Sequence, residues 1–500
     1  MDMAFLLSGS SYWLLTFAIA LMTAGYMKRF ISRPRNLPPG PTGLPFLGVA
    51  LTIFRSDPLA LFSSWADRYG DIVSFNVGPS VLVILNSYHV VKEAFRHPDL
   101  QNRHRSQLMK EISGGEGNNG ILLSDGERWK EHRNFVHSVF RNLGVGKKSY
   151  EEIVAKEMQQ LADAIDEKRG TPFDPNILFG QAVANIICSI VFGTQYKYSD
   201  KDFKRILELV KKNLELFGAA AWIILFPFPG ISKIPFGKVR DIVSNTKELN
   251  KFVWKLIESH EATFDPDQQK DLIDQYLYKM QQAKGTDTSF TLRNLEAVIK
   301  DLFFAGTDTT TNTLNWCILF MMVHPDIQSR VQDEIDHVIE RNRLPKLDDR
   351  QNLPYTNAVL MEIQRKAAVL ALGVPHVAAA DTQVAGFTIP KGATIVSNLY
   401  NVFNREDLWE NDDFRPERFL TKDGEFVKRD ELIFFSSGRR MCLGERLAKM
   451  ETFLGFTSLL QKFTFGKPNN SPPLSLAGAL GSTRNTISYL TCATPRQQIV

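Results

Sequence analysis

Cysteine is scarce in this sequence, since its 500 residues contain only Cys188, Cys317, Cys442 and Cys492. No two of them are close in the sequence, so the chain has neither a CxxC zinc motif nor a disulfide framework. So few cysteines in so long a chain are typical of a reducing compartment. One question remains open, which is why Cys442 lies among glycines and arginines.

An excess of charge of one sign is also missing. The sequence has 59 Lys and Arg residues against 55 Asp and Glu residues, for a formal net charge of +4. A nucleic-acid-binding protein normally shows a concentrated basic face, so we expect no nucleic-acid partner. The content of 44% hydrophobic and 23% charged residues excludes disorder, collagen and coiled coil as the main architecture.

A long hydrophobic run occurs only at the N-terminus, where residues 3–27 contain no charged side chain. A helix of that length, at ~1.5 Å per residue, exceeds the ~30 Å hydrocarbon core of a bilayer. Asp2 precedes the run and Lys28 and Arg29 follow it, so the positive-inside rule leaves the rest of the chain in the cytosol. A cleaved signal peptide would have a basic start and a shorter apolar core. We therefore predict a single-pass membrane anchor over residues 1–30.

Proline and glycine are concentrated just after this run, in the segment Leu37-Pro38-Pro39-Gly40-Pro41. Proline fixes φ and restrains the preceding residue, so the segment cannot be helical. We predict a connector over residues 31–48, either a plain linker or a rigid spacer that sets the body against the membrane. One large catalytic domain then covers residues 49–500.

Helical periodicity dominates that domain. Residues 71–85, with a Gly78-Pro79 turn, predict a hairpin, and residues 374–398 and the tail predict short strands. The apolar segment 219–235 is either a buried loop or a second membrane contact. The fold class is therefore mainly α with a small β part (α+β). Helices are predicted at 58–70, 88–97, 146–169, 175–193, 201–217, 238–264, 291–324, 325–341, 355–367 and 442–464.

The setting of Cys442 is the strongest chemical signal, in Phe435-Ser-Ser-Gly438-Arg439-Arg440-Met441-Cys442-Leu443-Gly444. A helix N-terminus and neighbouring arginines stabilise a thiolate, and glycines let the backbone pass close to a flat ligand. Such a thiolate can hold haem iron. The alternative is a structural cysteine buried at the start of a helix.

A second signal lies within the predicted long helix, in Ala305-Gly306-Thr307-Asp308-Thr309-Thr310. Glycine in a helix interior costs roughly 1 kcal/mol relative to alanine and so requires a reason. Ala305 and Gly306 would leave room for dioxygen over a flat cofactor. Thr309 could hydrogen-bond bound oxygen and Asp308 could relay protons from solvent. The alternative is a kinked segment whose hydroxyls bond back to the helix.

Two further pairs share a helix face: Glu362 with Arg365, and Trp129 with Arg133. Taken alone, each is best interpreted as an ordinary surface pair of small energetic value.

The Cys442 segment resembles the haem-binding loop of the cytochrome P450 family, F-x-x-G-x-R-x-C-x-G. Its fixed positions are met by Phe435, Gly438, Arg440, Cys442 and Gly444. The resemblance extends from Pro38 to the tail and implies the cytochrome P450 fold. It also implies haem b as cofactor, with Cys442 as the axial iron ligand.

The same resemblance implies roles for the other signals. Asp308 and Thr309 resemble the catalytic pair of the oxygen-activating helix. Glu362 and Arg365 resemble the ExxR pair, completed by Arg418 in a structural network that holds the cysteine loop. The haem propionates would be bound by Trp129, Arg133, His376 and Arg440.

The implied function is that of a haem-thiolate monooxygenase in the endoplasmic reticulum membrane. NADPH-cytochrome reductase would supply electrons, with cytochrome b5 as a second candidate donor. The substrate would be apolar and enter from membrane lipid: a long-chain fatty acid, a steroid or a xenobiotic. Residues 305–312 are most similar to the branch associated with fatty-acid hydroxylation. Docking residues for the reductase would be Arg141, Lys147, Lys148, Arg439 and Lys449.

Three alternatives stay open. A haem-thiolate isomerase or dehydratase would need no reductase, but proteins of that type tend to lose the acid–threonine pair that Asp308 and Thr309 form here. A haem-binding or lipid-binding membrane protein without turnover would not need the pair. A helical membrane protein without haem would give no thiolate-ligated Soret band.

Overall fold

The computed structural model describes residues 36–112, 117–219, 233, 237–341, 343–410 and 413–496, together with 16, 17, 20, 23 and 24. The predicted anchor over residues 1–30 and most of segment 219–235 lie outside these residues. Among the residues that the structure does describe, no helix combines the length and hydropathy that crossing a bilayer would require.

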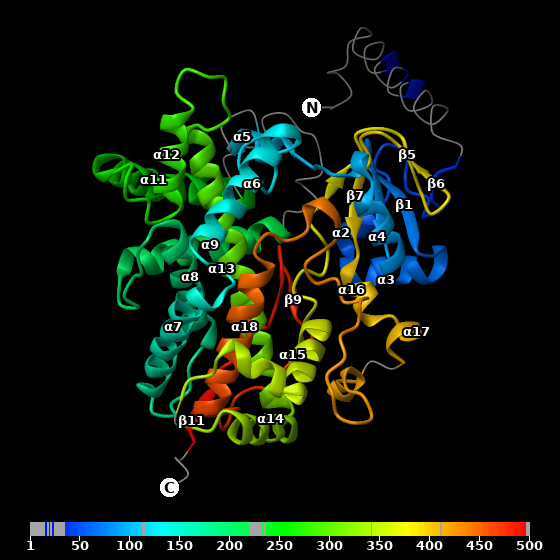
Figure 1. Cartoon of the computed structure of the whole chain (residues 1–500). Helices are drawn as coiled ribbons and strands as arrows, with labels where there is room; N and C mark the ends of the chain where they lie inside the picture. Colours follow the sequence, from blue (N-terminus) through cyan, green and yellow to red (C-terminus); the bar gives the residue numbers. More distant parts are fainter. Residues whose placement is uncertain are drawn as a thin grey trace, which may run out of the picture.

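The body is built around one long helix, α13 (Leu292–Val323), which has 32 residues and runs through the middle of the molecule (Figure 1). It packs against α8 (Pro175–Val191) and α18 (Glu445–Lys462), and α18 in turn packs against α7 (Lys148–Asp166). All four helices contribute fully buried side chains to one large apolar core. Because α13 is covered on several sides, its sequence is apolar along most of its length.

The remaining helices surround this core. The longest of them, α9 and α11, pack against each other, and α11 also contacts α13. Their bounds are α2 (Ala50–Arg55), α3 (Pro58–Tyr69), α4 (Tyr88–Arg96), α5 (Gln107–Ile112), α6 (Gly126–Asn142), α9 (Lys201–Ala219), α11 (Gly237–Thr263), α12 (Leu272–Gln282), α14 (Pro325–Val338), α15 (Pro354–Ala367), α16 (Leu399–Asn404) and α17 (Glu406–Trp409).

The main sheet has five strands in the order β1-β2-β7-β4-β3 and lies beside the helical body (Figure 1). The first two form the predicted hairpin, with Ile72 opposite Leu85 and the turn at Gly78-Pro79. The strands are β1 (Ile72–Val77), β2 (Ser80–Leu85), β3 (Asn102–Arg103), β4 (His376–Val377) and β7 (Thr394–Ser397).

Three two-stranded sheets complete the β part: β5 (Thr382–Val384) with β6 (Phe387–Ile389), β8 (Phe463–Gly466) with β11 (Cys492–Pro495), and β9 (Ala479–Leu480) with β10 (Arg484–Asn485). The fold is thus mainly helical with small sheets.

The proline-rich connector lies against the sheet. The Ser74 amide donates to the Pro39 carbonyl at 2.9 Å and the Ser74 hydroxyl to the Pro38 carbonyl at 2.5 Å. A chain held in this way adds an extended segment beside the edge of β1. Prolines are tolerated there because only their carbonyl groups are used, and the N–H group that proline lacks is not needed.

Two predictions about secondary structure need correction. The helix predicted from Cys442 begins at Glu445, with Gly444 as its N-cap, so Cys442 lies in the preceding loop. The segment up to residue 441, which the sequence suggests is irregular after the strands, contains α16 and α17. Both are short helices of at most six residues, below the length at which periodicity gives a clear signal.

Candidate functional site

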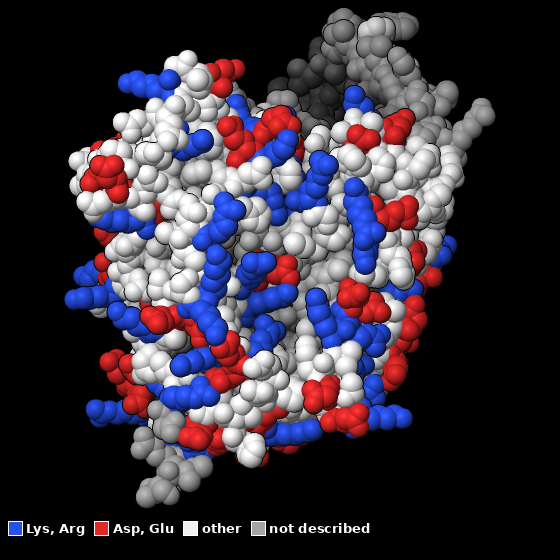
Figure 2. All heavy atoms as spheres, viewed as in Figure 1, with Lys and Arg blue, Asp and Glu red and all other residues white. Residues whose placement is uncertain are grey.

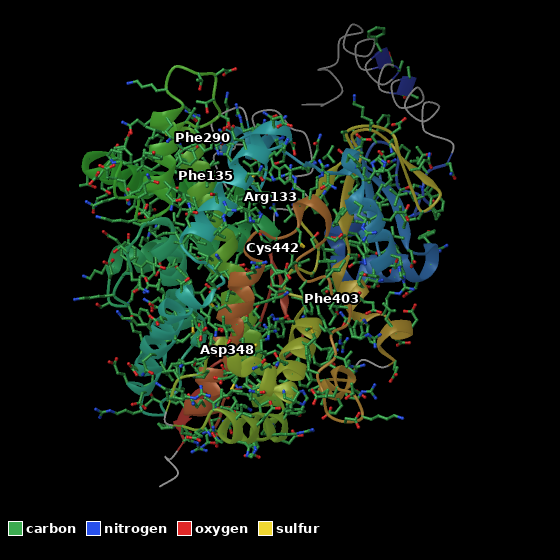
Figure 3. The ribbon with its side chains drawn as sticks, in the orientation of Figure 1. Arg133, Phe135, Phe290, Asp348, Phe403 and Cys442 are labelled. Atoms are coloured by element: carbon green, nitrogen blue, oxygen red, sulfur yellow. The ribbon has the colours of Figure 1, made fainter. Side chains whose placement is uncertain are left out.

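The Cys442 loop has a backbone that few sequences could adopt. Gly438 has φ 74°, and a Cβ there would lie 2.0 Å from the Phe95 carbonyl oxygen, so only glycine fits. Ser436 also has a positive φ, of 65°. The Cys442 amide donates to the Phe435 carbonyl at 2.9 Å. The loop therefore presents the thiol from a fixed turn, close to α6 (Figure 3).

The thiol of Cys442 is accessible in a setting that otherwise encloses it. Desolvation raises its pKa, while a hydrogen bond from the Gly444 amide and the positive charge of Arg133 lower it. The sequence suggested Arg439 and Arg440 as the stabilising cations, and this is wrong: Arg439 is exposed and Arg440 bonds to Asp125. Without metal the thiol form is favoured, because burial is the largest influence on its pKa.

Cations gather beside this loop around one carboxylate. Asp125 accepts a hydrogen bond from Arg440 at 2.7 Å and another from Arg105 at 2.7 Å. The guanidinium carbon of Arg440 lies 4.0 Å from the centre of the Trp129 ring, and that of Arg133 lies 5.7 Å from the same ring centre. Arg133 also donates to the Met441 carbonyl at 2.6 Å. The structure thus brings together Trp129, Arg133 and Arg440 as the sequence grouped them.

Arg103 is a member of this cluster that sequence reasoning missed. It is buried, its Nη1 donates to the Val374 carbonyl at 2.7 Å, and its Nε has no partner among the described residues. Burial and the positive charge of Arg440 lower the pKa of Arg103 to about 9. Repulsion of Arg103 by the positive charges of Arg440 and Arg133 shows that positive charge is in excess in this cluster. The only sequence signal is the run Asn102-Arg103-His104-Arg105.

His376 lies at the edge of the cluster. Its Nδ1 lies 2.6 Å from the Leu100 carbonyl, an acceptor, so Nδ1 carries a proton. The ring stacks on Phe95 at 4.1 Å, and burial and the positive charge of Arg103 lower its pKa. Nε2 is the ring nitrogen that remains for a haem propionate, whose negative charge would raise this pKa.

The middle of α13 presents an open face to the same region. Ala305 is exposed, whereas Phe303 and Thr307 are buried and the residues next to Ala305 are partly buried. Thr309 lies one turn further on. The Thr309 hydroxyl donates to the Ala305 carbonyl at 2.8 Å. Gly306, expected to make room for dioxygen, instead faces α8: a Cβ there would lie 2.4 Å from Ile187 Cδ1. The small size of Gly306 therefore allows α13 and α8 to approach each other. The space expected for dioxygen would lie over Ala305 instead.

Asp308 points away from Thr309. Its Oδ2 accepts a hydrogen bond from the Thr483 hydroxyl at 2.6 Å, and Asn312 is a second partner. Burial raises the pKa of Asp308. In the described part of the chain no hydrogen bond joins the Asp308 and Thr309 side chains. Asp308 therefore ties α13 to the turn before β10.

The predicted structural network of Glu362, Arg365 and Arg418 has buried side chains. Glu362 accepts two hydrogen bonds from Arg365, at 2.7 and 2.8 Å, and one from Arg418 at 3.1 Å. The Arg415 amide also donates to Glu362, at 3.1 Å. Arg365 completes its set with the Phe403 carbonyl at 2.6 Å, so the three predicted residues are in contact.

A further pair of α13 side chains fixes the loop that carries Asp125. Asp301 accepts from the amides of Ile121 and Leu122 at 2.7 and 2.8 Å, and Asn294 accepts from the Gly120 amide at 2.9 Å. Burial raises the pKa of Asp301 to about 6. Neither residue was predicted, because nothing in the local sequence shows that distant amides need an acceptor.

These residues fit a haem. Cys442 would supply the thiolate ligand, and Asp125 is shared by the guanidinium groups of Arg105 and Arg440, with Arg103 and Arg133 beside them. Such an excess, with a buried unpartnered Nε on Arg103, suits the two carboxylates of the porphyrin.

Comparison with known proteins agrees with this geometry. The cytochrome P450 family model matches residues 38–493. The chain is 40% identical over 481 residues to cytochrome P450 2J2 of Homo sapiens, covering 95% of this chain and 94% of that protein. It is 39% identical over 497 residues to cytochrome P450 2D4 of Rattus norvegicus, covering 98% of this chain and 99% of that protein.

Family membership rests on nearly the whole length of the chain, and it accounts for the thiol, the cations beside it and the open face of α13. The cofactor is haem, and the enzyme is a monooxygenase. The chain belongs to the cytochrome P450 family.

Proposed function

We propose that this monooxygenase hydroxylates or epoxidises an apolar substrate that enters from a membrane, with long-chain fatty acids, steroids and xenobiotics as the candidate classes. The observation that carries the proposal is the open face of α13, where Leu302, Ala305 and Thr309 follow each other at helical spacing. That face offers apolar surface and a single hydroxyl, so it suits a substrate held by its shape and apolar surface.

The haem supplies the activation of dioxygen, and the chain supplies the ligand, the fixed position and the route for protons. We assign Cys442 as the ligand and Arg103, Arg133, Trp129 and Arg440 as the residues that hold the propionates. The Thr309 hydroxyl would hold a proton at the open face of α13, where dioxygen would bind. Asp308 would join the proton path only after its carboxylate leaves Thr483, since that bond now occupies it.

The membrane part of the proposal has support on the described surface. Five large apolar side chains within eleven residues are exposed, in the last part of the predicted connector and just after it. Isolated exposed apolar residues are ordinary, but a group of this size marks an interaction surface. Attachment to the endoplasmic reticulum membrane would place it against lipid. The five residues are Leu44, Phe46, Leu47, Leu51 and Phe54.

A flavin reductase that uses NADPH is the electron donor in this proposal, with cytochrome b5 as a second. Figure 2 shows Lys and Arg side chains gathered over the middle of the face on which α18 and the Cys442 loop lie (Figure 1). Arg141 and Lys147 are exposed there, while Lys148 and Lys449 are paired with Asp348 and Glu445. Such a surface would favour an acidic partner.

The substrate class is tested by optical difference titration of the holoenzyme with a fatty acid, a steroid and a drug-like amine. Binding of the true substrate class displaces water from ferric haem and shifts the Soret band, and product analysis with reductase and NADPH then identifies the oxidised carbon. A polar metabolite that binds as tightly as the three apolar probes would contradict the proposal. Turnover without reductase or NADPH consumption would instead favour the isomerase alternative.

The role of Thr309 is tested with Thr309→Ala. We expect normal binding of carbon monoxide and a fall of at least tenfold in product formed per NADPH consumed. Thr313→Ala is the matched control, because the Thr313 hydroxyl makes the same bond to a helix carbonyl, to Thr309 at 2.8 Å. Equal coupling in the two variants would remove Thr309 from the proton route.

A further inference from the structure

A cavity borders the Cys442 loop. It has a volume of about 190 Å³ and lies between α15, α18, the 428–436 segment and the loop itself. Phe435, Ser436 and Met441 of the loop form part of its wall. The proposed substrate and haem residues, apart from Phe435, take no part in it.

The wall of this cavity is divided by chemistry. Most of its inner surface is apolar, whereas three cationic residues, Arg350, Lys428 and Lys449, and two carboxylates, Asp430 and Glu445, lie around it. Asp430 is exposed at the surface. Lys449 is paired with Glu445, and Lys428 is exposed at the surface. The apolar residues are Leu360, Met361, Leu432, Ile433, Phe434 and Phe453.

Arg350 is the distinctive residue of the cavity. Its Nε donates to Asn357 Oδ1 at 2.9 Å, and the Asn357 amide donates back to the Arg350 carbonyl at 2.7 Å, so the guanidinium is fixed in place. It also lies 5.6 Å from the centre of the Phe453 ring. Among the described residues, no carboxylate is within ion-pair distance of it. Burial lowers the pKa of Arg350 and no neighbouring negative charge opposes this.

A fixed, half-buried cation without a counter-charge is costly unless an anion joins it, and a guanidinium binds a carboxylate through two parallel hydrogen bonds. We propose that this cavity is a second ligand site, which binds a small amphipathic carboxylate with its head on Arg350 and its apolar tail against Phe453 and Leu432. At ~30 Å³ for each water-sized group, the volume holds about six non-hydrogen atoms. The five-carbon tail of hexanoate fits this volume, with the carboxylate on the half-buried Arg350 at its edge.

The site would communicate with the haem ligand through the loop. Phe435, in the cavity wall, accepts the hydrogen bond from the Cys442 amide, and Met441 is held by Arg133. A bound carboxylate therefore adds contacts to the segment that fixes the thiol. A small change in the absorption of the holoenzyme should accompany binding.

The test uses the holoenzyme with its haem site closed by a nitrogen-ligating azole. Hexanoate is then titrated in, and its binding is monitored by ligand-observed NMR. We expect one saturable site, with 1-hexanol binding at least tenfold more weakly. Arg350→Gln should weaken hexanoate at least tenfold, and Arg439→Gln, on the exposed surface outside the cavity, should leave it unchanged.

Folding of Arg350→Gln is checked by its carbon monoxide spectrum. If that variant does not fold, Met361→Trp, which fills the cavity, should abolish binding, and Lys428→Gln should weaken it two- to threefold. Absence of saturable binding to the azole-saturated enzyme would overturn the proposal. So would equal affinity in wild type and in a folded Arg350→Gln or Met361→Trp protein.

Discussion

The molecule has two clusters of arginine and carboxylate, one around Glu362 and one around Asp125, and they are built differently. Glu362 is surrounded by donors, and the arginines beside it end on backbone carbonyls, for example Arg418 on Trp409 at 2.6 Å. Asp125 faces Arg105 and Arg440 directly, with Arg103 and Arg133 nearby. The first cluster is complete within the chain, and the second has cations left over.

The difference separates a structural role from a binding role. A complete cluster gains nothing from a ligand, and removing one partner leaves a buried charge unpaired. An incomplete cluster carries the repulsion among its cations until an anion arrives. Burial lowers the pKa values of Arg103 and Arg440 most, to about 9 and about 10, and the neighbouring guanidinium groups lower them further. The Glu362 network also holds one guanidinium group more than it has carboxylates, but hydrogen bonds to backbone carbonyls satisfy its arginines, whereas Arg103 Nε in the second cluster has no partner among the described residues. An unsatisfied cation, more than burial or pairing, therefore distinguishes a ligand site from a structural network.

The largest expected effect is at the complete cluster. Glu362→Ala would leave the guanidinium groups of Arg365 and Arg418 buried without a counter-charge, at a cost of about 3–5 kcal/mol. We expect little or no folded holoenzyme, measured by the carbon monoxide spectrum and by urea unfolding. Glu410→Ala is the control, because Glu410 pairs with Arg415 at the surface. Equal stability of the two variants would show that the buried network is dispensable.

The incomplete cluster should respond through haem rather than through the fold. Arg440→Gln removes a charge-assisted partner of a propionate, a bond of about 1.5–3 kcal/mol, so haem affinity should fall ~10- to 100-fold. Transfer of haem to excess apomyoglobin measures the loss, with Arg439→Gln as control. If Arg440→Gln retained haem as firmly as the control, the excess charge would have another purpose.

Glu451 sharpens the comparison, since it is a buried carboxylate with no guanidinium at all. Its Oε1 has no hydrogen-bond partner among the described residues, and burial raises its pKa to about 8. The folded state therefore holds the proton more tightly than the unfolded chain, at ~4.5. Its contribution to stability is full below pH ~4.5, declines as the pH rises towards 8, and is lost above it.

Glu451→Gln should remove that pH dependence. We expect a gain of about 1–2 kcal/mol at pH 8, because the new amide still leaves one polar group unpaired. Thermal unfolding between pH 5 and pH 9 measures the slope, and Glu445→Gln, near the surface of the same helix, should keep the wild-type slope. An unchanged slope in Glu451→Gln would mean that Glu451 is not the titrating group.

The smallest effect should be at the rim of the incomplete cluster. Arg105 is partly exposed and bonds only one oxygen of Asp125, so Arg105→Gln should cost less than about 1 kcal/mol. Urea unfolding of the holoenzyme tests this. A loss as large as that of Glu362→Ala would show that the two clusters are alike after all.

Features whose residues lie close together in the sequence could be predicted from it. The Cys442 motif and the pair Glu362–Arg365 lie within ten residues, so the sequence displays them directly. The long helices were predicted because apolar periodicity accumulates over many turns. The hairpin was predicted from a turn flanked by β-branched residues.

Features that depend on distant partners could not be predicted. Arg440 and Asp125 are 315 residues apart, and Asp301 and Ile121 are 180 apart. The direction of Asp308 towards Thr483 and the contact of Gly306 with Ile187 are equally non-local. Local sequence showed that these residues needed partners but could not name them.

The bond between Asp308 and Thr483 has a consequence for biosynthesis. A ribosome makes the carboxylate of α13 long before it makes its partner, and likewise makes Asp125 long before Arg440. The helices can begin to pack while the chain is still growing, but the pocket cannot close until the later segments arrive. Haem can therefore be held fully only after the segment with Arg440 and Cys442 has been made, and the growing chain must keep its guanidinium cluster accessible until then.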